Sequence, residues 1–200
     1  NLGQLDWRAD ELSVDMRSAA YALKRFGVRV GRRALFLPRL IRPLPSALAA
    51  LLWAVHARLA HVPAAPAPGL TSFALDKEDN ETPDAFLAAA FFREMGGRAI
   101  RLDILERVEE LLVDASRQGR DADETQAAIF SLLGAANEDA AALVAALGWK
   151  REIRGTGSEA KPVWQRVRKG QHARKRGGAD KPLPRPDSPF AGLAALIPTD

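Results

Sequence analysis

The chain has 200 residues, of which 47% are hydrophobic and 27% are charged, and this is enough to bury a core in one domain or two small ones. It contains no cysteine, which excludes disulfide frameworks and thiolate metal sites. The longest apolar runs, 44–55 and 189–198, are too short to cross a bilayer, so we expect no membrane contact and a cytoplasmic location.

The net charge of +4 hides a strong segregation of charge along the chain. Residues 1–61 hold ten Lys and Arg against four Asp and Glu, and residues 148–185 hold twelve against three. The middle, 70–147, holds seven against sixteen. Basic blocks attract polyanions, and the same blocks can also be solvated or pair with the acidic middle. We favour nucleic-acid binding by the two basic flanks.

Residues 1–61 have the pattern of a helix, a hairpin and a second helix. Helical spacing over 6–26 ends at Gly27, and short β-prone runs at 28–30 and 34–37 predict a hairpin. The second helix is marked by apolar residues that we expect to form its buried face: Leu44, Leu48, Leu51, Leu52, Val55 and Leu59. We interpret 1–61 as an accessory segment.

A proline- and alanine-rich connector, 62–69, separates this segment from the rest. After it, 70–75 predicts a short strand. Thr82, followed by a proline, predicts the cap of a helix that runs to residue 95. The glycines at 96 and 97 should end that helix.

Three helices followed by two strands are predicted in the second half. An extended run at 98–102 precedes a helix whose buried face holds Ile104, Leu105, Val108, Leu111 and Leu112. The second helix, 123–133, is capped by Asp123, and the third begins at Asn137 and ends at Gly148.

Candidate strands at 149–154 and 163–168 complete this region. The order predicts a winged-helix-like domain over 70–168, and a generic helical bundle with an irregular tail is the alternative. The fold class is therefore mainly α with small β-hairpins.

The segment 169–200 is rich in Lys, Arg, Gly and Pro, and we expect a disordered basic tail. It ends in a short amphipathic segment that is a candidate contact for a protein partner, with Phe190, Leu193, Leu196 and Ile197 as its apolar residues.

No catalytic arrangement is evident. The phosphate-binding pattern GxxxxGK[ST] and the serine-nucleophile pattern GxSxG do not occur, and the three histidines form no metal-binding pair. We therefore predict no catalytic residue, metal or cofactor in this chain. One helix carries closely spaced carboxylates, for which a solvated face is favoured over a cation site: Glu106, Glu109, Glu110 and Asp114.

The candidate nucleic-acid-binding residues fall into three groups. Around the first hairpin they are Arg29, Arg32, Arg33, Arg39 and Arg42. In the predicted wing they are Lys150, Arg151, Arg154, Lys161, Trp164, Arg166 and Arg168. At the start of the tail they are Lys169, Arg174, Lys175 and Arg176. For Trp149 and Trp164, packing in the core is favoured over stacking on a base.

The third predicted helix argues against sequence-specific reading. In a helix-turn-helix this element presents donors and acceptors to base edges. Here it begins with Asn137 and two carboxylates and continues almost entirely with alanine, leucine and valine. We therefore expect binding to phosphate and to the shape of the nucleic acid.

Four stretches resemble a known family when taken in order: FGVRVGRRALFLPRLIRPLPSALAALLWAV, PDAFLAAAFFREMGGRAIRLDILERVEELL, SLLGAANEDAAALVAALGWKRE and PDSPFAGLAAL. They resemble the C-terminal region of alphaproteobacterial superfamily-two helicases related to the mitochondrial degradosome RNA helicase. The resemblance implies a parent enzyme that hydrolyses ATP, with RecA-like motor domains before residue 1 that bind ATP and Mg²⁺. No residue of this chain matches a helicase motif, so no catalytic role is transferred.

The leading hypothesis is a non-motor accessory region that binds RNA or DNA beside the motor domains of a helicase. A protein-interaction scaffold is the first alternative, in which the acidic middle and the apolar C-terminus contact other proteins. A free-standing winged-helix regulator is the second, and the acidic third helix makes it less favoured.

Overall fold

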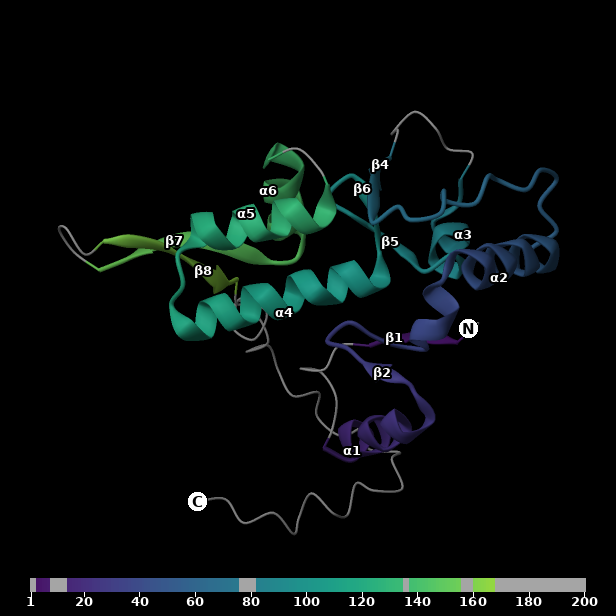
Figure 1. The fold of residues 1–200 in the computed structure, drawn as a ribbon, viewed down its shortest axis with the longest axis horizontal. Helices are drawn as coiled ribbons and strands as arrows, with labels where there is room; N and C mark the ends of the chain where they lie inside the picture. Colours follow the sequence, from purple (N-terminus) through teal and green to yellow (C-terminus); the bar gives the residue numbers. More distant parts are fainter. Residues whose placement is uncertain (1–2, 8–13, 76–81, 135–136, 156–159, 168–200) are drawn as a thin grey trace, which may run out of the picture. The chain divides into compact units, whose positions relative to one another are not determined.

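The computed structural model describes residues 3–7, 14–75, 82–134, 137–155 and 160–167. The predicted basic tail and its C-terminal apolar segment lie outside these ranges. Within them, the chain is mainly helical with small antiparallel sheets, as predicted (Figure 1). No helix of the described part has both the length and the hydropathy that crossing a bilayer requires.

The first sheet joins the predicted hairpin to a strand that the sequence did not indicate. Strands β2 (Arg29–Val30) and β3 (Ala34–Phe36) pair antiparallel and confirm the hairpin. Strand β1 (Gln4–Asp6) pairs with the other edge of β3. Asp6 is therefore part of a strand, and its assignment to a helix was wrong, because the free edge of β3 offers hydrogen bonds that local spacing does not reveal.

The first helix is shorter than the spacing over 6–26 predicts. Helix α1 spans Val14–Ala22 and continues as a 3-10 helix, η1, over Leu23–Phe26. Gly27 ends it with a φ of 80°, a left-handed conformation that glycine adopts without steric cost, as predicted.

Helix α2 (Pro43–His56) follows the 3-10 helix η2 (Pro38–Ile41), and proline occupies its first position. The helix was predicted correctly, but the assignment of its faces was wrong. Its buried residues are Ala49, Ala50 and Ala54. Most of the large apolar residues that were expected to be buried are exposed: Leu44, Leu48, Leu51, Leu52 and Val55.

The second sheet has the order β4 (Ser72–Ala74), β6 (Arg98–Arg101), β5 (Phe92–Met95). The strand predicted at 70–75 is confirmed by β4. Gly96 and Gly97 connect β5 to β6 with φ values of 61° and 81°, which suit a two-residue hairpin turn of type I′.

Helix α3 (Asp84–Ala89) is much shorter than predicted, because the chain leaves the helix before β5. Phe91, which lies between α3 and β5, has a positive φ of 64° and is fully buried. The predicted cap was also wrong: the N-cap residue is Pro83, with no side-chain cap hydrogen bond from Thr82. Pairing of β5 with β6 outweighs the local preference for a longer helix.

The second half contains the three predicted helices and the predicted hairpin. They are α4 (Leu102–Gln118), α5 (Ala122–Leu133), α6 (Asn137–Ala146), β7 (Trp149–Arg154) and β8 (Lys161–Arg166). All five contribute to one hydrophobic core. In Figure 1, α5, α6 and the β7–β8 hairpin lie on one side of α4, and β1 and β2 lie on the other.

The cap of α5 lies two residues before the predicted position. The side chain of Asp121, not Asp123, accepts hydrogen bonds from the backbone N–H groups of Asp123 and Glu124. Both aspartates precede the apolar spacing, so the pattern alone did not distinguish them. Gly134 ends this helix in the left-handed conformation, as predicted.

Residues before and after the proline-rich segment 62–69 belong to one compact unit. Ala34 and Phe36 of β3 are buried in a small core with Ala49, Phe91 and Leu102. Nonlocal packing therefore connects the first sheet directly to α2 and to the start of α4.

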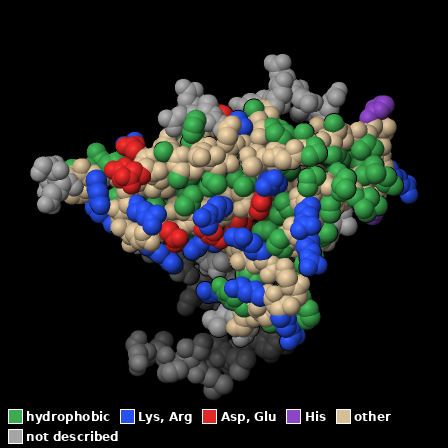
Figure 2. All heavy atoms as spheres, in the orientation of Figure 1, with side chains coloured by type: hydrophobic (Ala, Val, Ile, Leu, Met, Phe, Trp, Pro, Cys, Tyr) green, Lys and Arg blue, Asp and Glu red, His purple; other side chains and the backbone are tan. Residues whose placement is uncertain are grey.

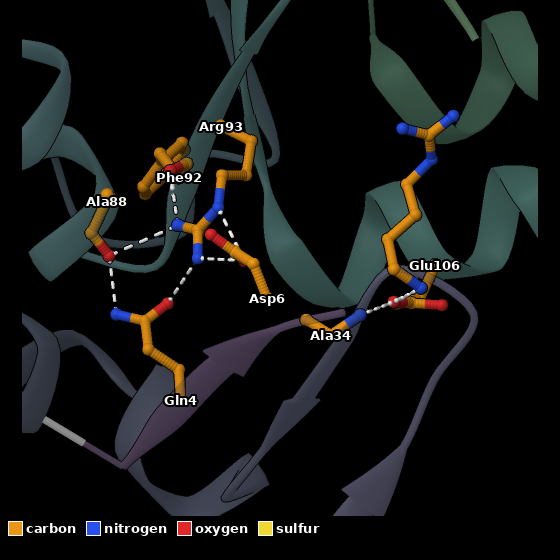
Figure 3. Close-up of polar contacts among 8 residues, drawn as sticks. Gln4, Asp6, Ala34, Ala88, Phe92, Arg93 and Glu106 are labelled. Carbon is orange, nitrogen blue, oxygen red and sulfur yellow. Dashed lines mark hydrogen bonds and ion pairs between the residues drawn. The ribbon is translucent and has the colours of Figure 1, made fainter. Parts of the chain in front are cut away.

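Arg93 ties β1 to α3 and β5 (Figure 3). Its guanidinium donates to Oδ1 of Asp6 (2.6 Å), to Oε1 of Gln4 (2.9 Å) and to the carbonyl oxygens of Ala88 and Phe92. The side-chain amide of Gln4 also donates to the oxygen of Ala88 (2.5 Å). These hydrogen bonds help to hold β1, which has only three residues, at the edge of the first sheet.

The first hairpin is attached to α4 by one buried carboxylate. The turn of the hairpin wraps around Glu106, whose Oε2 accepts from the N–H of Arg32 (2.6 Å). Its Oε1 accepts from the N–H groups of Arg33 and Ala34, both at 2.8 Å. Figure 3 shows the Ala34 N–H directed at this carboxylate. A Cβ on Gly31 would overlap the Glu106 carboxyl group, so the turn requires glycine at this position.

The prediction of a solvated carboxylate face on α4 was wrong for two of its members. Glu106 is 0% exposed and Glu109 is 2% exposed. The pKa of the Glu106 carboxyl lies above its ordinary value, mainly because burial disfavours the charged form. The three backbone N–H donors offset part of this rise, and the nearby Glu109 adds to it. Glu106 and Glu109 are therefore structural residues.

Replacing Glu106 by alanine should destabilise the fold strongly, because one buried and two partly buried N–H groups would lose their acceptor. We expect Glu106→Ala to lower the free energy of unfolding by ~3 kcal/mol, measured by urea denaturation of the full chain.

Glu110→Ala on the same helix is the matched control, because Glu110 is partly exposed and pairs with two exposed arginines, Arg29 and Arg107. It should cost less than ~1 kcal/mol. Equal losses in the two variants would contradict the anchoring role of Glu106.

Candidate nucleic-acid interface

The β7–β8 hairpin is positioned by its tryptophans. Trp149 and Trp164 are both buried in the core formed with α4, α5 and α6. The indole N–H of Trp164 donates to the carbonyl oxygen of Ala122 at the start of α5 (3.1 Å). The interpretation of the tryptophans as core residues is confirmed. At 6% exposure, the Trp164 ring leaves no face on which a base could stack.

The distal end of the hairpin carries two like charges opposite each other. Antiparallel register places Arg154 directly across from Lys161, so both side chains lie on the same face. Both are exposed, and neither forms an ion pair with any described residue. This is the strongest local positive charge on the hairpin that has no acidic partner among the described residues.

The other basic residues of the hairpin are partly neutralised. Arg151 pairs with Asp123 of α5 at 2.7 Å, and Lys150 pairs with the neighbouring Glu152. Arg166 is not without a partner either. These exposed pairs contribute little to stability, but each places a carboxylate close to a cation. The distal end therefore attracts an anion better than the base of the hairpin.

The arginines of the first hairpin are directed largely toward the chain's own carboxylates. Nε of Arg33 lies 2.6 Å from Oε1 of Glu109, and Arg29 lies 2.9 Å from Glu110. Arg32 contributes its backbone N–H to the Glu106 site. Acidic residues of α4 thus neutralise two of the three arginines of this hairpin.

Arg39 and Arg42 form a separate exposed pair of cations beside α2. Arg39 lies in η2 and Arg42 is the N-cap of α2, and no described acidic group pairs with either. In Figure 2, Lys and Arg side chains spread along the lower part of the face and alternate with Asp and Glu. On this face, the described Lys and Arg side chains do not form one uninterrupted positive surface. Arg168 of the predicted wing and the tail residues from Lys169 onward lie outside the described part.

The buried residues Glu106 and Glu109 were missed by the sequence reasoning, although a signal for them exists. They fall at the helical spacing of Leu102, Leu105 and Leu112, which places all five side chains on one face of α4. An acidic residue inside an apolar stripe indicates a buried polar contact.

Helix α6 offers little for reading bases. Its exposed side chains in the described part are Ala141, Ala142, Ala145 and Ala146. Asp139 is engaged by Arg98 of β6 at 2.8 Å, and Arg98 also donates to Ser72. Alanine carries no hydrogen-bonding group, so these positions cannot discriminate base edges.

Comparison with known proteins does not assign the chain to a family. No protein-family model, no curated protein and no solved structure matches the chain. The resemblance to helicase C-terminal regions therefore stays a prediction, and the candidate interface is defined by the residues alone.

Replacing Trp164 by phenylalanine separates packing from nucleic-acid contact. We expect Trp164→Phe to lower the free energy of unfolding by ~1–2 kcal/mol, because the hydrogen bond to Ala122 and part of the packed ring are lost.

Because the ring is buried, affinity for single-stranded RNA should change less than about twofold, measured by fluorescence anisotropy under conditions in which the variant stays folded. A large loss of affinity with an intact fold would show that Trp164 contacts the nucleic acid.

Proposed function

We propose that this chain is a non-motor accessory region of an ATP-dependent helicase, and that it binds RNA or DNA through the β7–β8 hairpin without sequence specificity. The observation that carries the proposal is the exposed cross-strand pair of Arg154 and Lys161. Like charges directly opposite each other on a sheet destabilise it, and an anion between them relieves the repulsion. A phosphate group of a nucleic-acid backbone is an anion of suitable size and charge.

The order of elements supports a winged-helix-like arrangement as the finer description of the second half. Three helices are followed by an antiparallel hairpin, and both strands of the hairpin pack on the helices. In this proposal the hairpin is the wing and contacts the phosphate backbone. Helix α6 takes the place of a recognition helix, and its alanine surface accounts for the absence of sequence specificity.

The motor chemistry belongs outside this chain. The family resemblance implies that ATP and Mg²⁺ bind to RecA-like domains of the parent protein, which are also its expected partners. The residues described here hold and orient a strand by electrostatic attraction, and none of them is assigned a catalytic role.

A protein-interaction scaffold is a second candidate function, because α2 exposes five large apolar side chains. A free-standing winged-helix regulator is less favoured, because the exposed surface of α6 carries no base-reading group in its described part.

Reversing the charge of the hairpin pair tests the leading proposal. The double variant Arg154→Glu/Lys161→Glu should weaken binding of the full chain to single-stranded RNA and DNA about tenfold at low salt, for every sequence tried. If two phosphate contacts are lost, the slope of log K against log salt concentration should become shallower by about 1.4.

The control is Lys24→Glu/Arg25→Glu, which changes the net charge equally on η1. It should leave both affinity and salt slope close to those of the unmodified chain. An equal loss in the control would mean that binding depends on net charge alone, and no loss in the hairpin variant would remove the hairpin from the interface.

A further inference from the structure

Helix α2 presents a continuous apolar stripe to solvent. Each member lies three or four residues from at least one other member, which places them on one side of the helix. They are 46–85% exposed: Leu44, Leu48, Leu51, Leu52 and Val55. We call these five side chains the leucine face. In Figure 2, hydrophobic side chains gather at the end of the molecule that α2 forms.

The opposite side of α2 is already occupied. Ala50 and Ala54 are buried in a core with Phe86 and Leu87 of α3, and Ala49 is buried in the core that contains Phe91. Small side chains on this side permit close approach of the two helices. The helix therefore packs through its alanines and Trp53 and leaves its leucines and Val55 in water, whereas a surface helix ordinarily buries its aliphatic side chains.

Positive charge is found at the two ends of the leucine face and not along it. Arg42 is the N-cap of α2 and Arg58 follows its C-cap, and both are exposed. No residue between 43 and 55 is charged, and the whole stretch 16–75 has nine Lys and Arg but no Asp or Glu. Neither Arg42 nor Arg58 has an acidic partner in the part of the chain that the structure describes.

We propose that the leucine face binds an amphipathic helix of a partner protein, with carboxylates at both ends of that helix pairing with Arg42 and Arg58. A helix of α2's 14 residues is ~21 Å long, so a partner helix of similar length would place its terminal charges beside both arginines. An apolar stripe on a helix matches this surface, as in other helix-in-groove complexes. Acidic ends are favoured because the surrounding segment supplies only positive charge.

A lipid surface fits these observations less well. Helices that lie in a membrane interface carry Lys and Arg along a solvated polar face. The side of α2 away from the leucine face is instead buried against α3, and the charges are confined to the helix ends. The proposed site shares no residue with the β7–β8 hairpin, so it goes beyond the proposed nucleic-acid function.

The test uses the full chain and two synthetic helical peptides of the same length as α2. Both carry the same leucine stripe, and they differ only in having Glu or Lys at their ends. We expect the Glu-ended peptide to bind at least tenfold more tightly than the Lys-ended one, measured by fluorescence anisotropy of the labelled peptide. The difference should shrink at high salt, because exposed ion pairs are screened.

Two variants locate the binding. Leu48→Gln/Leu52→Gln should reduce affinity for the Glu-ended peptide at least tenfold while leaving the fold intact, because both side chains are exposed. Leu23→Gln/Phe26→Gln, which changes two exposed apolar residues of η1, is the matched control and should bind as the unmodified chain does.

The proposal is overturned if the two peptides bind equally, if neither binds, or if the leucine-face variant binds normally. It is also overturned if the leucine face is instead needed for binding to phosphatidylserine vesicles or for dimerisation in light scattering. None of these results changes the expectation for the hairpin variants, so the two proposals fail independently.

Discussion

The bond between the Glu106 carboxylate and the turn of the first hairpin is the constraint on which the arrangement of this chain depends. One acidic side chain on α4 satisfies three backbone N–H groups that the short turn cannot pair within itself. The absence of a side chain at Gly31 allows this approach. Because the site is buried, removing the carboxylate leaves unsatisfied donors in a place that water reaches poorly.

This attachment also decides what the first basic flank can do. A turn rich in N–H groups and arginines has the properties of an anion-binding site, and Glu106 already occupies it. Arg33 and Arg29 are then directed toward Glu109 and Glu110. The acidic middle of the chain therefore neutralises two arginines of the first flank. Exposed cations without a described acidic partner remain, among other places, beside α2 and at the end of the β7–β8 hairpin.

Two exposed surfaces of different chemistry result. The end of the hairpin presents Arg154 and Lys161 on one face and suits a polyanion, whereas α2 presents leucines between two arginines and suits an amphipathic helix. Buried tryptophans attach the hairpin to the core, and buried alanines attach α2. The side chains proposed to bind are therefore different from those that pack in the core. Under the two proposals, one chain would contact a nucleic acid and a protein through different residues.

The sequence by itself determined the elements whose signals are local: the helices α4 to α6, the β7–β8 hairpin, the stops at Gly27 and Gly134, and the burial of the tryptophans. Tertiary structure alone decided strands β1 and β5, the face that α2 buries, and the role of Glu106. A helix period shows which side chains share a face, and only the distant segments that pack there decide whether water or protein covers it. Residues 92–95 form a strand because they pair with β6. Glu106 is buried because it accepts hydrogen bonds from a hairpin turn that lies 72 residues away in the sequence at Ala34.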